Sequence, residues 1–410
     1  MPTFEYVAKD KTGKEVKGSQ EAASKDVLVK QLRDKGLMTS KVQERKSQAV
    51  VARKTGRKRG GGKVNLRHLS IFCRQFATMI NAGVSLVRCL DVLEQQTDSA
   101  KLKEIIRDIE SEVEGGATLS RSMAKFPLVF SNLATGLVRA GEVGGVLDET
   151  LDRLAGFLEK DMEMRRKVKA AMTYPVLVMF VAVGIVTFLV TFILPKFISL
   201  FRELGMGDDK FPLPTLMLMK VSNFATSKWY IMIILIVCTT IAVNRLKRTK
   251  TGKRYYDILK LRVPVFGSLN HKIAIARFAR TLSTLLASGV PILQAMETVA
   301  GTVDNDIISD AILMSRASIR EGDTIADPLA SSKIFPPMVV QMITIGEETG
   351  QLDQMLEKVA EFYEGEVDAA LESLTAALEP VLIVFLGFVV GFIVVAMFLP
   401  LISIIGELSQ

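Results

Sequence analysis

Two long runs of apolar residues dominate the pattern of hydrophobic and polar positions along the chain. Residues 176–194 contain no charged side chain and, at about 1.5 Å per residue, would form a helix roughly 29 Å long. Residues 381–399 are equally free of charge. Both runs therefore predict membrane-crossing helices. A third run, 229–243, has only fifteen residues, and we expect it to cross with Lys228 reaching back to the interface.

The distribution of Lys and Arg predicts the direction of each crossing. Basic residues precede the first apolar run and follow the shorter one: Arg165, Arg166, Lys167 and Lys169, then Arg245, Lys247, Arg248, Lys250, Lys253 and Arg254. Because basic flanks stay on the cytoplasmic side, we expect the chain to leave, return and leave again. The polar start of the chain does not resemble a secretory signal peptide. We therefore expect a cytoplasmic N-terminus and a periplasmic C-terminus.

The chain repeats itself at a shift of 205 to 206 residues. Arg74 matches Arg280, and a Gly-Glu-x-x-Gly-x-Leu-Asp motif occurs twice. Its residues are Gly141, Glu142, Gly145, Leu147 and Asp148, and then Gly346, Glu347, Gly350, Leu352 and Asp353. Pro175 and Pro195 match Pro380 and Pro400. Two copies of one unit are predicted, each a helical domain followed by a membrane helix. Both copies point the same way, unlike the inverted repeats of many transporters.

Each repeat contains apolar residues at helical spacing, from which we predict about six helices. In the first repeat, a helix follows the cap residue Asn65 and ends at Gly83. At the doubled motif, glycine would end one helix, and Glu and Asp would favour the positive end of the next. We interpret the motif as a corner between helices, with a contact for a partner or neighbouring subunit as the alternative. Pro175 and Pro380 fit either a first helical turn or a kink.

The N-terminal residues follow a different pattern. Phe4, Tyr6 and Ala8 alternate as in a strand, a turn follows at Lys11–Lys14, and Ser24 can cap a helix. A hairpin, a helix and a short strand are predicted. The next segment is rich in Lys, Arg and Gly, which predicts a flexible linker. Its charge suits anionic lipid better than nucleic acid, because no aromatic residues are interleaved with it.

The predicted fold is a mainly α integral membrane protein with two repeated cytoplasmic bundles, three transmembrane helices and a small N-terminal α/β module. In chain order we expect an N-terminal module (1–43), a basic linker (44–65), a first cytoplasmic bundle (66–174), a first membrane helix (175–195), a periplasmic loop (196–228), a second membrane helix (229–244), a basic cytoplasmic connector (245–274), a second bundle (275–379), a third membrane helix (380–400) and a periplasmic tail (401–410).

Composition supports this division. Apolar residues make up 49% of the chain and charged residues 23%, so the apolar excess is concentrated in the spans. The net charge of +8 is uneven, because from Ile275 to Glu379 six Lys or Arg face seventeen Asp or Glu. The second bundle is therefore acidic, whereas the linker and membrane flanks are basic. An acidic bundle of this kind offers a surface for a basic partner.

No pattern of catalytic residues emerges from the sequence. Each Gly-Lys pair lacks the following Ser or Thr of a phosphate-binding loop. His68 and His271 stand apart from other ligand-type residues, and Cys73, Cys89 and Cys238 fit small buried hydrophobic positions. We expect no enzyme activity, no cofactor and no metal. Charge-free spans also disfavour a transporter, which is kept as a remote alternative.

The membrane entry and exit carry a longer signature. Lys167, Tyr174, Pro175 and Pro195, with the intervening apolar residues, resemble inner-membrane platform proteins of type IV pili and type II secretion systems. The resemblance extends over nearly the whole chain. It implies a non-enzymatic, homo-oligomeric scaffold that contacts a hexameric cytoplasmic assembly ATPase, and also a retraction ATPase in some systems. It further implies contacts with pilins, other inner-membrane pilus components and membrane lipid, but not nucleic acid.

The sequence departs from this family in two places. The second repeat has Ala370, Leu371, Glu372 and Leu374 where the first has its basic approach to the membrane. Some secretion-system relatives suggest a metal held by acidic residues after the first corner, but here Asp152 is followed one turn later by Gly156. The basic linker favours the pilus branch, with a type II secretion platform as the alternative.

Overall fold

A computed structural model describes residues 3–9, 15–21, 25–34, 38–45, 64–203, 207, 211–247 and 249–408. The chain divides into two compact units, 1–62 and 63–410. In the first unit, strand β1 (Thr3–Lys9) pairs antiparallel with β2 (Glu15–Glu21) on one side and with β3 (Met38–Arg45) on the other. Helix α1 (Lys25–Asp34) precedes β3 and buries Leu28. Of the expected linker and the Lys11–Lys14 turn, residues 46–63 and 10–14 lie outside the described residues.

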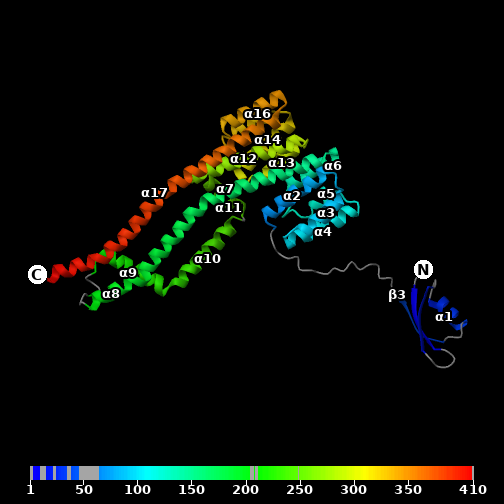
Figure 1. Cartoon of the computed structure of the whole chain (residues 1–410), viewed down its shortest axis with the longest axis horizontal. Helices are drawn as coiled ribbons and strands as arrows, with labels where there is room; N and C mark the ends of the chain where they lie inside the picture. The colour runs from blue at the N-terminus through cyan, green and yellow to red at the C-terminus, as the bar shows by residue number, and fades with distance from the viewer. Residues whose placement is uncertain are drawn as a thin grey trace. The chain divides into compact units, whose positions relative to one another are not determined.

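The second unit begins with a bundle of short helices (Figure 1). They are α2 (Leu66–Asn81), α3 (Leu86–Gln96), α4 (Ala100–Glu114), α5 (Leu119–Met123) and α6 (Asn132–Gly144). Polar caps start four of them, because the side chains of Asn65, Ser99, Thr118 and Ser131 each accept a backbone N–H of the first turn. The glycines at 83 and 116 have positive φ and permit the turns that follow α2 and α4.

A long helical segment leaves this bundle. Helix α7 (Leu147–Phe188) continues through a π-helical turn, η1 (Leu189–Ile193), into α8 (Leu194–Glu203). Pro175 lies inside α7, so its placement in a first helical turn is wrong. The helix begins at the corner and packs along both bundles before it reaches the proline, and this packing offsets the backbone hydrogen bond that proline cannot make.

Three helices connect the first long segment to the second bundle. They are α9 (Leu213–Ser227), α10 (Trp229–Leu246) and α11 (Lys250–Arg262). Within the described residues, two helical segments are long and apolar enough to cross a membrane, Leu147–Glu203 and Leu352–Ser403. Helix α10 contains the shorter apolar run, and its crossing stays a prediction.

The second bundle repeats the order of the first. It contains α12 (Phe266–Ala287), α13 (Ile292–Thr302), α14 (Asp306–Glu321), α15 (Ala326–Ser331) and α16 (Pro337–Thr349), and it leads into α17 (Leu352–Leu408). Helix α12 begins within the segment expected to be a connector. Pro380 and Pro400 both lie inside α17. Helices α7 and α17 run from the bundles toward α8 and α9 (Figure 1).

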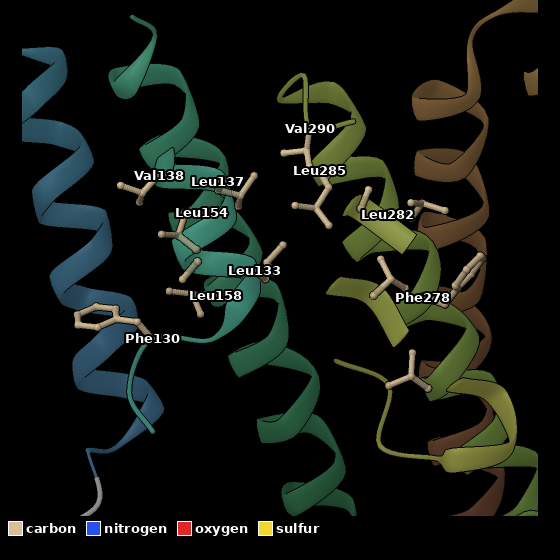
Figure 2. Packing of buried hydrophobic residues seen from close by; sticks show 14 of the residues in the cluster. Phe130, Leu133, Leu137, Val138, Leu154, Leu158, Phe278, Leu282, Leu285 and Val290 are labelled. Atoms are coloured by element: carbon tan, nitrogen blue, oxygen red, sulfur yellow. The ribbon is translucent and has the colours of Figure 1, made fainter. Parts of the chain in front are cut away.

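One hydrophobic core joins the two bundles. Leu133, Leu137 and Leu154 of the first repeat belong to the same buried cluster as Phe278 and Leu285 of the second. Figure 2 shows these side chains on neighbouring helices of the two repeats. Because the core is continuous, the bundles form one body and do not behave as separate domains on a tether.

Candidate functional site

The first corner motif is a compact joint between α6 and α7. The Glu142 carboxylate accepts the backbone N–H groups of Leu119 (2.5 Å) and Ser120 (3.2 Å), which would otherwise be unpaired at the start of α5. Gly145 ends α6 with a φ of 70°. Gly141 lies inside α6, where a β-carbon would lie 2.0 Å from the Thr150 hydroxyl of α7, so the close approach of the two helices requires glycine there.

The second corner has the same geometry. The Glu347 carboxylate accepts the N–H groups of Ile325 (2.6 Å) and Ala326 (3.2 Å). Gly350 ends α16 with a φ of 68°, and a β-carbon at Gly346 would lie 2.8 Å from the α-carbon of Leu352. The motif therefore has a structural explanation in both repeats.

The remaining motif residues lie at the starts of the long helices. Leu147 and Leu352 pack against the core. Asp148 and Asp353 occupy the first turns of α7 and α17, where a carboxylate is favoured by the helix dipole. Asp148 is exposed and available for a partner.

A pair of arginine clamps was not predicted from the sequence. Arg74 on α2 donates two hydrogen bonds to Glu159 on α7, both at 2.7 Å, and a third to Asp152 at 2.5 Å. The bond from Arg74 lowers the pKa of the Glu159 carboxyl group. The counterpart of Arg74 in the second repeat, Arg280, donates two hydrogen bonds to Glu364, at 2.9 and 3.1 Å. Each clamp joins the first helix of a repeat to its long helix.

The repeat identity of Arg74 and Arg280 was the only sequence signal for these clamps. Their acidic partners lie 85 and 84 residues further along the chain. Only the packed bundle brings the charges together. Asp152, considered for a metal in relatives, is thus engaged by Arg74.

The long helices of the two repeats meet along a seam just before the apolar runs. Lys167 donates to Asp368 at 2.6 Å, and this bond raises the pKa of the lysine. Leu371 and Leu374 are buried there against Val168 and its neighbours on α7. This burial explains the departure from a basic approach in the second repeat, because a charged side chain at these positions would be enclosed between the helices.

Both signature prolines at the far ends of the long helices free a backbone carbonyl. In the η1 turn, the Leu194 N–H bonds to Leu189, and Pro195 has no N–H, so the Val190 carbonyl lacks a helical donor. The buried Ser222 hydroxyl of α9 donates to it at 2.7 Å.

The second proline has the same effect. Pro400 cannot donate to the Ala396 carbonyl, and the buried Thr215 hydroxyl of α9 donates to it at 2.5 Å. Helix α9 therefore holds both long helices where they would otherwise carry unpaired polar groups. Near the other end of the apolar runs, Tyr174 and Pro380 are exposed, whereas Pro175 is buried.

A groove of about 1460 Å³ lies between the two bundles. Arg121 and Arg139 line it from the first repeat, and Gln294 and Glu297 line it from the second. Beside the corner, Val143 is 84% exposed. The combination of an apolar side chain, both charge signs and a hollow surface suits a protein partner.

The acidic surface of the second bundle is partly occupied by the chain itself. Lys253 of α11 pairs with Asp306 at 2.5 Å, and Arg254 lies 3.8 Å from Asp310. The buried Asp257 carboxylate accepts the N–H of Asp306 at 2.9 Å. The connector thereby covers the start of α14, and the expected surface for a basic partner is smaller than the sequence suggests.

The candidate ligand residues do not assemble. Among the described residues, no three His, Cys, Asp or Glu side chains form a group able to hold a metal. His271 donates from its ring to the Ile334 carbonyl at 2.7 Å. Cys73 is buried, which raises the pKa of its thiol to about 12. Cys238 is exposed, so its expected burial is wrong, because most of α10 faces outward.

Comparisons with known proteins agree over the whole chain. The family model described as type II secretion system, protein F, matches residues 72–195 and 278–400, and the model of its N-terminal domain matches residues 1–43. A type IV pilus assembly protein PilC of Thermus thermophilus is 45% identical over 100% of both chains. Another from Myxococcus xanthus is 43% identical over 99% of this chain and 96% of its own. A type II secretion system protein F of Vibrio cholerae is 32% identical over 100% of both chains.

Proposed function

The chain belongs to the type II secretion system protein F family, and from this premise we propose that it is the inner-membrane platform of a type IV pilus machine. It would couple a hexameric cytoplasmic ATPase to the insertion of pilin subunits into the growing fibre. The identities to pilus assembly proteins, 45% and 43%, exceed the 32% identity to a secretion protein and favour the pilus branch. We propose that the chain itself catalyses no bond chemistry.

The observation that carries this proposal is the continuity of the long helices. The segments Leu147–Glu203 and Leu352–Leu408 each contain 57 residues, about 85 Å at 1.5 Å per residue. The hydrocarbon core of a membrane accounts for roughly 30 Å of that length. The remainder extends into the bundles, so a displacement of the bundles moves the apolar segments with them.

Three features stiffen this connection. The common core fixes the bundles to each other, the arginine clamps fix each bundle to its long helix, and the seam fixes the long helices together. Packed helices of this kind transmit rigid-body motion, because close-packed interiors deform little. We propose that the ATPase acts on the bundles and that the movement reaches pilins beside the apolar segments.

We further propose three crossings of the inner membrane. Helix α10 would return the chain to the cytoplasm between the two outward spans, which the shared direction of the repeats requires. The basic residues before the apolar run of α7 and after the apolar run of α10 support cytoplasmic bundles, and the C-terminus would be periplasmic. A reporter fused at residue 410 should read as periplasmic, and one at residue 260 as cytoplasmic.

The exposed apolar side chains of the bundles are the proposed contact surface for the ATPase. Leu128, in the loop before α6, is 93% exposed, and Val143, in the first corner, is 84% exposed. Met314, on α14 of the second bundle, is 65% exposed. Contiguous exposed apolar patches mark protein interfaces, and we propose that these side chains belong to such a patch. We propose that a retraction ATPase would use the same surface and that the platform is a homo-oligomer.

A photo-crosslinking residue at each of these positions tests the contact in cells. We expect capture of the assembly ATPase from one or more bundle positions and no capture from Phe180, an exposed position within the first apolar run. Absence of the ATPase from every bundle position would refute the coupling proposal. Recovery of other proteins alone would not support it.

A second experiment tests the transmission of force. Glu372 is an exposed residue of α17 within the seam, next to the buried Leu371 and before the apolar run. Glu372→Pro should interrupt the helix there at a cost of about 3 kcal/mol, whereas Glu372→Ala keeps it intact. We expect the proline variant to insert and bind the ATPase but to lose surface pili, and the alanine variant to assemble them. Normal piliation of the proline variant would contradict a rigid connection.

Protein secretion is the alternative activity, supported by the full-length identity of 32% to the Vibrio cholerae protein. Deletion of the gene distinguishes the two roles. Loss of surface pili with normal release of exported enzymes supports the pilus role, and the reverse result supports secretion. Solute flux in proteoliposomes would revive transport, which the charge-free runs disfavour.

A further inference from the structure

A basic groove of about 320 Å³ lies where α7, α11 and α12 meet. Its apolar wall includes Val168 and Met172 of α7 and Leu261 of α11. Four cationic side chains line it as well, Arg165, Lys169, Lys260 and Arg277. The groove thus combines positive charge with an apolar surface.

The four cations are not equally engaged. Arg165 donates to Asp161 at 2.9 Å, and Arg277 lies 3.4 Å from both Asp161 and Asp304. Lys169 and Lys260 make no ion pair within the described part of the chain. Two ammonium groups are therefore left to attract an anion in the groove.

The groove lies at the boundary between the polar and apolar parts of α7. Val168 and Met172 are four residues apart on one face of that helix, and the next position in the series, Val176, is 61% exposed in the apolar run. The apolar wall of the groove is thus continuous with the surface predicted to face lipid. A free anion would use the charges but not this apolar surface.

Helix α11 independently indicates that the groove lies at the surface of the membrane. It follows α10 closely and exposes Tyr255 (70%) and Leu259 (60%) among its basic residues. The Lys247 ammonium lies 3.8 Å from the ring centre of Tyr256. Exposed tyrosine, leucine and lysine on one helix are typical of a segment at the membrane–water interface.

We propose that this groove binds an anionic glycerophospholipid of the cytoplasmic leaflet. The phosphate would lie between Lys169 and Lys260, and an acyl chain would follow Val168, Met172 and Val176. Basic pockets beside membrane helices on the cytoplasmic side suit such headgroups. Because α7 belongs to the first repeat and α12 to the second, the bound lipid would join the two repeats at the membrane surface. The proposal rests on the proposed topology and not on the pilus role.

Lipid binding can be measured with the purified full-length protein in detergent. The probes are phosphatidylglycerol, zwitterionic phosphatidylcholine, and inorganic phosphate or glycerophosphate, with binding followed by native mass spectrometry and thermal shift. We expect phosphatidylglycerol to bind and raise the melting temperature, and the other probes to have little effect. Equal stabilisation by phosphatidylcholine would refute recognition of the lipid's negative charge. Equal stabilisation by phosphate would show that the groove binds a free anion and would refute the lipid site.

A double variant and a matched control locate the site. Lys169→Gln with Lys260→Gln should weaken phosphatidylglycerol binding about thirtyfold, from about 1 kcal/mol for each basic residue. The control, Lys220→Gln with Lys228→Gln, removes the same charge from α9 and its C-terminal end, which the proposed topology places on the periplasmic side of the membrane. It should leave phosphatidylglycerol binding unchanged. Equal binding by the wild type and the first double variant would refute the proposal, as would equal weakening by both pairs.

A crosslinking measurement on the unmodified protein covers the case in which the first variant does not fold. A photoactivatable phosphatidylglycerol should label α7, α11 or α12 around the groove, in competition with unlabelled phosphatidylglycerol. Labelling confined to other helices would overturn the assignment. This result is independent of ATPase capture, so failure of the lipid site and failure of the platform role are distinguishable.

Discussion

Replacement of Glu347 is the sharpest test of the corner interpretation. Its carboxylate accepts two backbone N–H groups, at 2.6 and 3.2 Å, from residues that begin α15. Both donor residues, Ile325 and Ala326, are buried. In Glu347→Ala these donors lose their acceptor without access to bulk water. At about 1.5 kcal/mol for each bond to a charged acceptor, we expect a destabilisation of about 3 kcal/mol.

Two further substitutions make the reasoning refutable. Glu348→Ala changes the neighbouring exposed glutamate and should shift stability by less than about 0.5 kcal/mol. Glu347→Gln retains one acceptor oxygen and should lose about half as much as Glu347→Ala. Thermal unfolding of the purified full-length variants in one detergent provides the comparison. Equal melting temperatures for Glu347→Ala and Glu348→Ala would refute the structural role, and a loss of pili without a loss of stability would assign the motif to a partner contact.

Three other predictions concern buried or strained groups. Thr215→Val and Ser222→Ala should each destabilise the protein by about 1–3 kcal/mol and so lower its melting temperature, because each leaves a proline-freed carbonyl unpaired. Thr226→Ala, whose hydroxyl bonds within its own helix, should have a smaller effect. The Cys73 thiol should resist iodoacetamide in the folded protein and react after unfolding. Burial raises its pKa from 9.0 to about 12, so its contribution to stability should be present below pH 9 and be lost as the pH rises toward 12. Val265→Gly should stabilise the protein by about 1 kcal/mol in thermal unfolding, because Val265 holds a φ of 67° that glycine adopts without strain. Alkylation of Cys73 as fast in the folded as in the unfolded protein would contradict its burial. A melting temperature of Val265→Gly below that of the wild type would contradict the strain at Val265.

Local sequence patterns predict much of the helical architecture because they depend on spacing along one helix. The helix start at Asn65 and the helix ends at glycines follow from backbone requirements that a few adjacent residues satisfy. The repeat then transfers each assignment from one bundle to the other. The family resemblance depends on the same local signature and is confirmed by the comparisons over the full chain.

Contacts between distant segments could not be read in this way. The acidic partner of Arg74 became evident only when α2 and α7 were packed together. In the sequence, Leu371 and Leu374 stand where the first repeat has basic residues. In the structure, both leucines are buried in the seam between α7 and α17. Pro195 and Pro400 were visible as a repeat pair, whereas the hydroxyl groups that serve their freed carbonyls come from a loop helix with no repeat counterpart among the described elements.

The seam also constrains the order in which the protein can mature during synthesis. Lys167 and Asp368 are 201 residues apart, and Arg277 meets Asp161 across 116 residues. The first long helix is therefore complete before its lateral partner has been translated, with Val168 uncovered at the seam. The second apolar run and all five short helices of the second bundle are synthesised before the residues that close this surface. A ribosome stall after residue 300 would leave a half-molecule with an open apolar edge, and exposed apolar surface of this kind makes incomplete chains prone to aggregate.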